Sequence, residues 1–584
     1  MNRIKYKIVL IILFSTIGVA YSQIKEERVR AKRTQQPDTK KIVKKGQIAE
    51  EPNKTEIKND TLNYTIEDVE AVSDFKTSQL PPQEIQNLPK EKIYDNYAKA
   101  AYGNFDHLLL QVFYTHKLNE KMNVGGKFTH NSSTGLKNDF PWNSDDALND
   151  IEVFLNSNLE KGKLNIVANY NFKKVNYYGI QTLIIPPFNN DSNLQQKYNM
   201  ISVKGNYDAF SNKYFDKANI KTGYFWDAFN SKESFVEGDI YSDISDIETE
   251  LPLVGEIDFG IETEAKLKLT HTEFSEISPL KTSYFTSSIT PILKFEGEKF
   301  NLKIGGGITY NVESESGNSD IYFHPRANIE YLFGSKITLF GGIEGGLQQN
   351  SYADISTQNP FVAPLLTIVP TNTKYNIFSG IKGELGVNFK YTVQGNYSNV
   401  ENILFFQKPI FNSIFGLNNN AYNHLNSFST LYDDGKILGV SGQLNYIAIE
   451  KLNVQLNAKF ENYQLDNLSK AYYKPTITSD ISASFLMLKD KLIVSSKLYF
   501  VGERKANDYI KSNANAIIID QNDVVNSEIT LKSYVDFNLS LSYKIKPYLS
   551  IFVNGINLLN SDYQRYTKYT VQGTQVLGGV LFKF

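Results

Sequence analysis

The chain has 584 residues, a formal net charge of −2, no cysteine, 37 tyrosines and 37 phenylalanines. The missing cysteine excludes disulfide frameworks, thiolate metal sites and lipid anchoring through a cysteine, and the small net charge argues against a general nucleic-acid binder. A chain of this length normally folds into several domains, unless one large sheet closes on itself.

Residues 1–22 predict a secretory signal peptide. Three basic residues precede an apolar run over 8–19, and the small residues Ala20 and Ser22 follow at the spacing that a signal peptidase reads. The run is shorter than the ~20 residues that a membrane-spanning helix needs. We expect cleavage after Ser22, and because no other run is long enough to span as a helix, the mature chain can cross a membrane only as a β-barrel.

Residues 23–95 predict a mostly disordered periplasmic tail. The segment is rich in Lys, Glu, Gln, Asn, Thr and Pro and has almost no aromatic residues, so it cannot bury enough apolar area to offset chain entropy. Its first part, 24–45, holds nine basic residues against three acidic ones. One hypothesis is that these cations enter a barrel lumen and close it by meeting acidic residues on the wall; the alternatives are that the tail binds a partner or stays solvated.

Period-two alternation begins at Tyr97 and continues to the C-terminus. In 452–461, five apolar residues alternate with five polar ones, and 164–173 and 300–310 show the same pattern. This spacing predicts β-strands with one apolar face. A soluble sandwich would show the same alternation, so the strands alone do not decide the architecture.

The connections between the predicted strands favour a transmembrane barrel. Short links alternate with links that are mostly longer, and short turns at one rim with long loops at the other are typical of outer-membrane barrels. The short links are 119–121, 160–163, 211–217, 252–255, 296–299, 333–336, 382–386, 449–451, 489–491 and 544–547. The long ones include 133–147, 174–193, 349–373, 398–426 and 503–527.

The ten short links give the strand count. Each joins two strands, and a first strand near 97–105 and a last strand over 574–584 bring the prediction to about 22 strands. The predicted fold class is therefore all-β: a transmembrane antiparallel β-barrel over residues 96–584. Both ends of the barrel fall on the short-turn rim, which we expect to face the periplasm.

The last strand explains why the chain ends on an aromatic residue. A barrel needs an apolar outer face against lipid, and its last strand must pair with the first to remove the open edge. Val576, Val580, Phe582 and Phe584 share one face of this strand, which we expect to contact outer-membrane lipids. Val580, Phe582 and Phe584 also form a candidate signal for the barrel assembly machinery.

Two segments resemble a known family. The stretch 549–584, "LSIFVNGINLLNSDYQRYTKYTVQGTQVLGGVLFKF", resembles the end of TonB-dependent receptor barrels. The stretch 359–399 is similar to the middle of plug-less members of that group from Bacteroidetes-type bacteria. The resemblance covers roughly 60–584 and implies an outer-membrane barrel in a Gram-negative cell, but it says little about a substrate.

One departure from that family concerns the lumen. Family members carry a folded plug before the barrel and a short energy-coupling box, whereas the tail is too short and too polar to fold such a domain. The stretch 65–74 matches the box only loosely. Because barrels of this size are normally filled, we expect the tail, the long loops or another protein to occupy the lumen.

Two sets of residues are candidate sites. The first is an acidic patch on the lumen wall, for which the alternative is an ordinary polar lining paired with neighbouring lysines. The second is an apolar loop over 401–416, which is too apolar to lie in water and so folds into the lumen or meets a partner. The patch is Asp239, Asp243, Asp258, Glu262 and Glu264, and the loop residues are Phe405, Phe406, Phe411 and Phe415.

Catalytic patterns are absent from the sequence. The six histidines have no Ser or carboxylate at a spacing that indicates a triad or a metal site, so we expect no enzyme, no metal and no cofactor. Loss of the plug favours a membrane-embedded subunit or platform for other outer-membrane proteins or lipoproteins. The alternative is a solute transporter or pore gated by loops, tail or a partner. The expected location is the outer membrane, with tail and C-terminus in the periplasm and no nucleic-acid partner.

Overall fold

The computed structural model describes residues 94–136, 141–180, 194–210, 215–251, 255–409, 421–448, 451–511 and 524–584. All of them belong to the compact unit Leu88–Phe584. The predicted signal peptide and almost all of the predicted tail lie outside the described residues. None of the described helices is long and apolar enough to cross a membrane.

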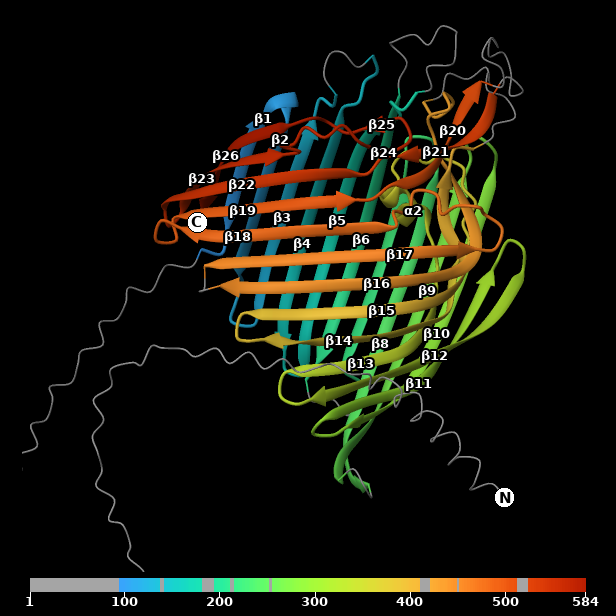
Figure 1. Cartoon of the computed structure of the whole chain (residues 1–584), viewed down its shortest axis with the longest axis vertical. Coiled ribbons are helices and arrows are strands. Elements are labelled where there is room, and N and C mark those ends of the chain that lie inside the picture. The colour runs from blue at the N-terminus through green and yellow to red at the C-terminus, as the bar shows by residue number, and fades with distance from the viewer. Residues whose placement is uncertain are drawn as a thin grey trace, which may run out of the picture. The chain divides into compact units, whose positions relative to one another are not determined.

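Twenty-two antiparallel strands form one closed sheet, which confirms the predicted fold class (Figure 1). Two further hairpins, β20–β21 and β24–β25, lie within connections and not in the barrel sheet. The strands are β1 (Tyr97–Gly103), β2 (Leu108–Lys117), β3 (Met122–Ser133), β4 (Asp146–Leu159), β5 (Gly162–Asn176), β6 (Gln195–Ala209), β7 (Lys217–Trp226), β8 (Lys232–Leu251), β9 (Gly255–Phe274), β10 (Leu280–Glu296), β11 (Phe300–Glu313), β12 (Asn318–Phe333), β13 (Ile337–Gln348), β14 (Thr371–Leu385), β15 (Phe389–Gln407), β16 (Ser429–Ala448), β17 (Leu452–Leu465), β18 (Ile477–Met487), β19 (Leu492–Val501), β20 (Arg504–Lys511), β21 (Val524–Leu531), β22 (Tyr534–Lys546), β23 (Leu549–Ile556), β24 (Gln564–Tyr566), β25 (Tyr569–Thr570) and β26 (Gln575–Lys583). The described helices are a 3-10 turn, η1 (Asn104–Asp106), and α2 (Tyr352–Gln358).

The first and last strands close the ring. β1 pairs with β26 from Tyr97 opposite Lys583 to Gly103 opposite Leu577, and the blue and red strands of Figure 1 lie side by side there. Asn96 and Phe584 extend the ladder, because each backbone N–H donates to the other's carbonyl at 3.3 and 3.0 Å. No edge strand is left open between them, as a lipid environment requires.

The two rims differ as the sequence predicts. Each of the ten short links falls where one barrel strand ends and the next begins at one end of the barrel, which we call the short-turn rim. The turn between β14 and β15 is at 386–388, slightly later than predicted. The opposite end, the long-loop rim, carries the long connections, although the links after β1, β7, β9 and β11 are short there as well.

The outer face of the last strand is apolar. Val576, Val580, Phe582 and Phe584 are 45, 47, 44 and 46% exposed on one side of β26, whereas Leu577 on the other side is 2% exposed. The set predicted to face lipid is therefore the outward-facing set. The same alternation continues on β23, where Ile551 and Val553 are 45 and 47% exposed.

A ladder of asparagines runs along the lumen wall across four strands. Asn156 donates to Asn123 at 2.9 Å, Asn165 to Asn156 at 2.6 Å, and Asn206 to Asn165 at 2.8 Å. These residues stand directly opposite one another in β3, β4, β5 and β6. A slip of one residue would turn the amides toward lipid, so the ladder fixes the register of this wall.

The terminal aromatic residue gives a first testable prediction. Phe584→Ser keeps the backbone bonds to Asn96 but removes the outward-facing ring. We expect the amount of assembled barrel in the outer membrane to fall several-fold, while barrel that has assembled keeps its wild-type melting temperature. Lys583→Ser, on the luminal face, is the matched control. Equal outer-membrane levels for Phe584→Ser and wild type would contradict a role of this ring in assembly.

Candidate functional site

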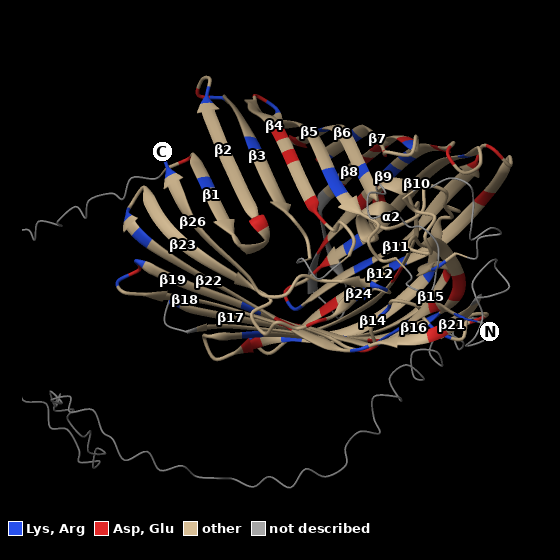
Figure 2. Cartoon of the chain, turned by 90° about the horizontal axis from the view of Figure 1, so that it is seen from above, with Lys and Arg blue, Asp and Glu red and all other residues tan. Residues whose placement is uncertain are grey.

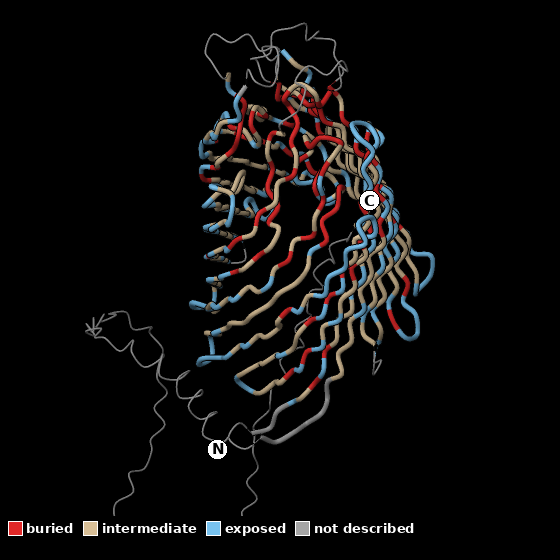
Figure 3. The backbone as a smooth tube through the Cα atoms, turned by 90° about the vertical axis from the view of Figure 1, so that its right-hand side faces the viewer, coloured by how far each residue is buried: buried red, intermediate tan, exposed pale blue. Residues whose placement is uncertain are grey.

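Three connections fold inward near the long-loop rim and pack together. They are 349–370, which contains α2, 421–428 and 557–574, and we call them the lid. Figure 2 shows α2 and β24 inside the ring of strands, and in Figure 3 the buried residues gather toward this end of the barrel. The described part of the chain therefore fills its own lumen at one end.

The lid has a hydrophobic core that reaches both walls of the barrel. Val175 on β5 and Phe406 on β15 belong to one buried cluster, although their strands are ten places apart in the 22-stranded ring. Within it the rings of Phe361 and Tyr569 stack at 3.6 Å. The buried members are Val175, Tyr198, Phe225, Phe274, Tyr352, Ile355, Val362, Leu366, Ile368, Leu404, Phe406, Phe428 and Tyr569.

Tyrosine hydroxyls fix the backbone of the lid. A loop segment buried away from water needs partners for its carbonyl groups, and tyrosine supplies a donor on an otherwise apolar ring. The donor and acceptor pairs are Tyr177 to Val362 O at 2.7 Å, Tyr198 to Pro360 O at 2.9 Å, Tyr284 to Ile368 O at 3.0 Å, Tyr178 to Thr570 O at 2.9 Å and Tyr569 to Asn426 O at 2.5 Å.

Glu233 on β8 holds the first turn of α2. Its fully buried carboxylate accepts the backbone N–H of Tyr352 at 2.6 Å and of Ala353 at 3.1 Å, and the hydroxyl of Thr272 at 2.7 Å. Ser351 caps the same turn through the N–H of Asp354 at 3.1 Å. A carboxylate at a helix N-terminus satisfies free N–H groups, so Glu233 anchors α2 to the barrel wall.

Asp227, in the link between β7 and β8, is a second buried anchor. It accepts the Tyr352 hydroxyl at 2.7 Å, the Gln196 amide at 3.1 Å and the backbone N–H groups of Phe229 and Ser231 at 2.9 and 2.8 Å. Burial raises the pKa of Asp227. Among the described ion pairs neither Asp227 nor Glu233 has a lysine or arginine partner, so neutral donors hold both carboxylates.

Buried cations hold the other side of the lid. Lys408 has no exposed surface and donates to Leu425 O at 2.9 Å, and its ammonium lies 3.1 Å from the Asp508 carboxylate. The Arg504 guanidinium donates to the carbonyls of Gln564 and Arg565 at 2.7 and 3.0 Å. The lid is thus tied to the β20–β21 hairpin as well as to the wall.

The predicted apolar loop, 401–416, is wrong in its start, while its fold into the lumen or contact with a partner stays a prediction. β15 continues to Gln407, because it pairs with β16 up to Gln407 opposite Ser429, so Phe405 and Phe406 lie on a strand. Phe406 joins the lid core and Phe405, with no exposed surface, packs in a second cluster with Val400 and Ile403. Phe411 and Phe415 lie outside the described residues.

The predicted acidic patch divides into paired and unpaired members. Three carboxylates have a lysine within 3.0 Å: Asp243 meets Lys294 at 3.0 Å, Glu262 meets Lys303 at 2.6 Å and Glu264 meets Lys266 at 2.7 Å. The alternative of an ordinary lining therefore holds for these three. Asp239 accepts only the Asn219 amide, at 2.7 Å, among its described bonds, and Asp258 is exposed near the start of β9.

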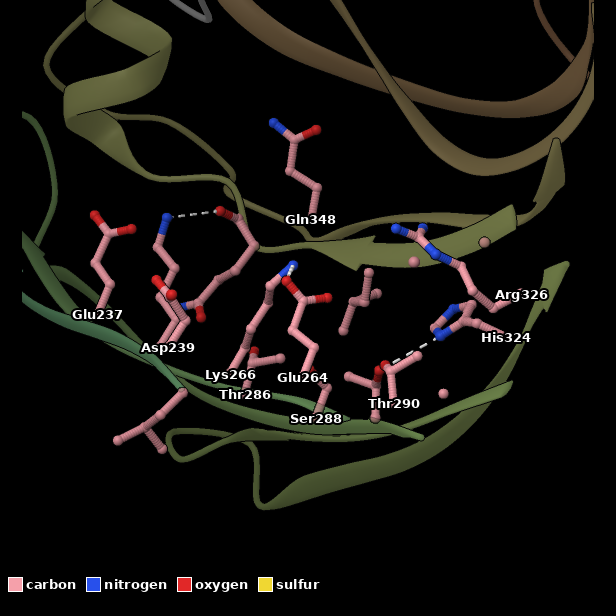
Figure 4. A pocket seen from close by; sticks show the side chains of 18 of the residues that line it. Glu237, Asp239, Glu264, Lys266, Thr286, Ser288, Thr290, His324, Arg326 and Gln348 are labelled. Atoms are coloured by element: carbon pink, nitrogen blue, oxygen red, sulfur yellow. Dashed lines mark hydrogen bonds and ion pairs between the residues drawn. The ribbon is translucent and has the colours of Figure 1, made fainter. Parts of the chain in front are cut away.

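A pocket of about 390 Å³ lies in the lumen between the lid and the wall of β8–β13 (Figure 4). It is next to the base of the lid, because Lys268 donates to Gln349 O at 3.2 Å and lies 3.7 Å from Asp354. Gly307, Gly345 and Gly346 line it without side chains, and the register of β13 shifts between Glu344 and Gly346. Among the described residues no group of His, Asp and Glu is placed to hold a metal ion.

Sequence reasoning missed the lid anchors. Glu233 and Asp227 carry no local motif, and Tyr352, which donates to both, lies more than a hundred residues further along the chain. The high tyrosine content was the one visible signal, because a wide lumen closed by loops needs apolar residues that also donate hydrogen bonds.

Comparisons with known proteins support the fold. No protein-family model and no curated protein matches the chain. It is similar to the solved siderophore receptor PirA from Acinetobacter baumannii, with a TM-score of 0.60 and 12% identity over 84% of this chain and 80% of that one. It is also similar to the ferripyoverdine receptor of the outer membrane of Pseudomonas aeruginosa (TM-score 0.57, 13% identity, 84 and 72% covered). The ferric-catecholate import receptor Fiu from K12 E. coli gives 0.56 and 10%, with 85 and 82% covered.

These similarities establish the fold. The barrel has the fold of TonB-dependent siderophore receptors, and together with the apolar outer face this fold indicates the outer membrane. At 10 to 13% identity the comparisons establish the fold and nothing about a bound substrate. The proteins it resembles in structure are receptors and not enzymes.

The Glu233 anchor gives a second testable prediction. Glu233→Ala leaves two backbone N–H groups and one hydroxyl buried without an acceptor, each at a cost of ~1–3 kcal/mol. We expect amide hydrogen exchange across 352–359 to accelerate by at least tenfold while the barrel strands keep their protection. The control is Glu330→Ala, which breaks only a half-exposed pair with Lys382 worth ~0–1 kcal/mol. Unchanged exchange in α2 would show that Glu233 does not anchor the lid.

Proposed function

We propose that this chain is a closed outer-membrane barrel that acts as a membrane-embedded subunit or platform of an outer-membrane protein complex. One observation carries the proposal: the lid is a packed core that reaches opposite walls of the lumen and is hydrogen-bonded to β8 and to the link before it. A pore open to diffusion would leave this space to water. If its own loops close the lumen, the barrel can contact other molecules only through its outer face and its two rims.

The short-turn rim offers a surface for a periplasmic partner. Along the arc from β12 to β19, Phe333, Leu385 and Leu488 are 62, 61 and 61% exposed, and Val387, in the turn after β14, is 93% exposed. Turn residues of this kind are usually polar, and exposed apolar side chains gathered on one arc favour contact with another protein or a lipoprotein. This assignment requires the short-turn rim to face the periplasm, as in barrels of this fold.

The second candidate function is transport. The solved barrels that the chain resembles in structure include siderophore and ferric-catecholate receptors. In a transporter the lid would be a gate, which would have to leave the lumen for a solute to pass. No plug domain is among the described residues, so the energy for this movement would come from a partner.

Conductance separates the two functions. The full-length protein in a planar bilayer should be silent, and a variant in which 352–361 is replaced by a short Gly-Ser linker should conduct, because the linker removes α2 and Phe361, which stacks on Tyr569. The wild-type protein purified in mild detergent should carry a partner at fixed stoichiometry. Steady wild-type conductance from a lone barrel would overturn the platform and favour the pore.

Single-cysteine labelling tests the orientation. The chain has no cysteine, so each introduced thiol is unique. A membrane-impermeant maleimide added to intact cells should label Leu559→Cys, 55% exposed after β23, and should spare Val387→Cys until the outer membrane is permeabilised. The reverse pattern would place the short-turn rim outside the cell and exclude a periplasmic partner there.

A further inference from the structure

We propose that the luminal pocket beside the lid binds a short zwitterionic peptide, with its ammonium group at Asp239 and its carboxylate at Arg326. Figure 4 shows Glu237 and Asp239 at one end of the pocket, Arg326 and His324 at the other, and Ser288 and Thr290 between them. This inference goes beyond the platform function, because a sealed barrel needs no luminal ligand.

At the acidic end Glu237 already lies 3.7 Å from the Lys221 ammonium, whereas Asp239 has no cation among the described ion pairs. Asp239 stands opposite Lys266 in the β8–β9 register, but the Lys266 ammonium lies 2.7 Å from Glu264 on its own strand. Among the described bonds Asp239 is left with the Asn219 amide at 2.7 Å. A carboxylate gains more from a cationic donor than from a neutral amide, so this end favours an ammonium group.

The basic end has a partner that a ligand can replace. The Arg326 guanidinium lies 3.3 Å from Glu344, and both side chains are nearly half exposed, at 43 and 46%. Exposed pairs of this kind contribute only ~0–1 kcal/mol. A ligand carboxylate that accepts two parallel N–H bonds from the guanidinium would compete with Glu344.

The spacing of the two ends fits a peptide of four or five residues. Four strand spacings of about 4.8 Å separate β8 from β12, roughly 19 Å along the wall, and Arg326 lies further toward the short-turn rim. An extended chain of this length spans about 13–17 Å, and the two charged side chains cover the remainder. Gln349 also lines the pocket, and its buried Oε1 has no hydrogen-bond partner among the described residues.

Glycines leave room for the ligand. A Cβ atom at Gly346 would meet no heavy atom within 4 Å, so a larger side chain there would fill the pocket without displacing the wall. Gly395 on β15 provides a matched control: it pairs with the outward-facing Val440, and its Cβ would come no closer than 3.9 Å to another atom.

The test uses full-length protein in nanodiscs and titration calorimetry with pentaalanine. Pentaalanine should bind, and acetylating its N-terminus or amidating its C-terminus should each weaken binding about tenfold. In Asp239→Asn, acetylation of the peptide should no longer weaken binding, whereas amidation still should. In Arg326→Gln, amidation should no longer weaken binding, whereas acetylation still should. Gly346→Leu should bind no peptide, whereas Gly395→Leu should bind as wild type does.

Three outcomes would overturn the proposal. They are no binding at millimolar pentaalanine, equal binding of the doubly blocked peptide, and end-group penalties that persist in Asp239→Asn and Arg326→Gln. If Gly346→Leu fails to fold, the two charge variants still decide the result. Conductance and partner stoichiometry are measured separately from peptide binding. A failed peptide titration therefore does not contradict the platform function, and a conducting barrel does not contradict the peptide site.

Discussion

Every backbone N–H and C=O group that enters lipid must find a partner within the protein, and the rest of this structure depends on that constraint. It forces the sheet to close, and the closure is the ladder between β1 and β26 that Asn96 and Phe584 extend. The alternating pattern of the strands follows, because one face meets lipid and the other meets the lumen. The Asn ladder shows the luminal consequence, in which polar side chains satisfy one another across strands.

Closing 22 strands leaves a wide lumen, and this creates the second problem that the chain solves. The described residues fill one end with loops whose side chains behave like the core of a soluble domain. Burial of each large side chain contributes about 1.5–3 kcal/mol, and the tyrosine hydroxyls prevent the loop carbonyls from being left without donors. The lid is therefore a small folded core whose outer boundary is the barrel wall, and its anchors Glu233 and Asp227 belong to β8 and the link before it.

The fold was predictable because each of its signals is local. Period-two alternation, short links between strands and the aromatic last strand are all visible within about ten residues, so the strand number and the outward-facing set Val576, Val580, Phe582 and Phe584 follow from the sequence. The acidic patch was predictable only in part: alternation places Asp243 and Glu262 in the lumen, but their neutralisation depends on Lys294 and Lys303, two strands away. The apolar loop was placed too early because the long pairing of β15 with β16 is not a local property.

The lid could not be predicted, because many of its bonds join positions far apart in the chain; Tyr352 and Asp227, for example, are 125 residues apart. These bonds also bear on what the barrel does. Ion pairs at an aqueous surface weaken with salt over a screening length of ~10 Å at 0.1 M, and a gate built on them opens easily. Lys268 and Asp354 form one such pair, but Glu233 and Asp227 accept from neutral donors instead, and each of these bonds, when broken, leaves a buried group at a cost of ~1–3 kcal/mol. Opening would break several such bonds together with the aromatic core, and this cost is the physical reason for proposing a platform over a pore.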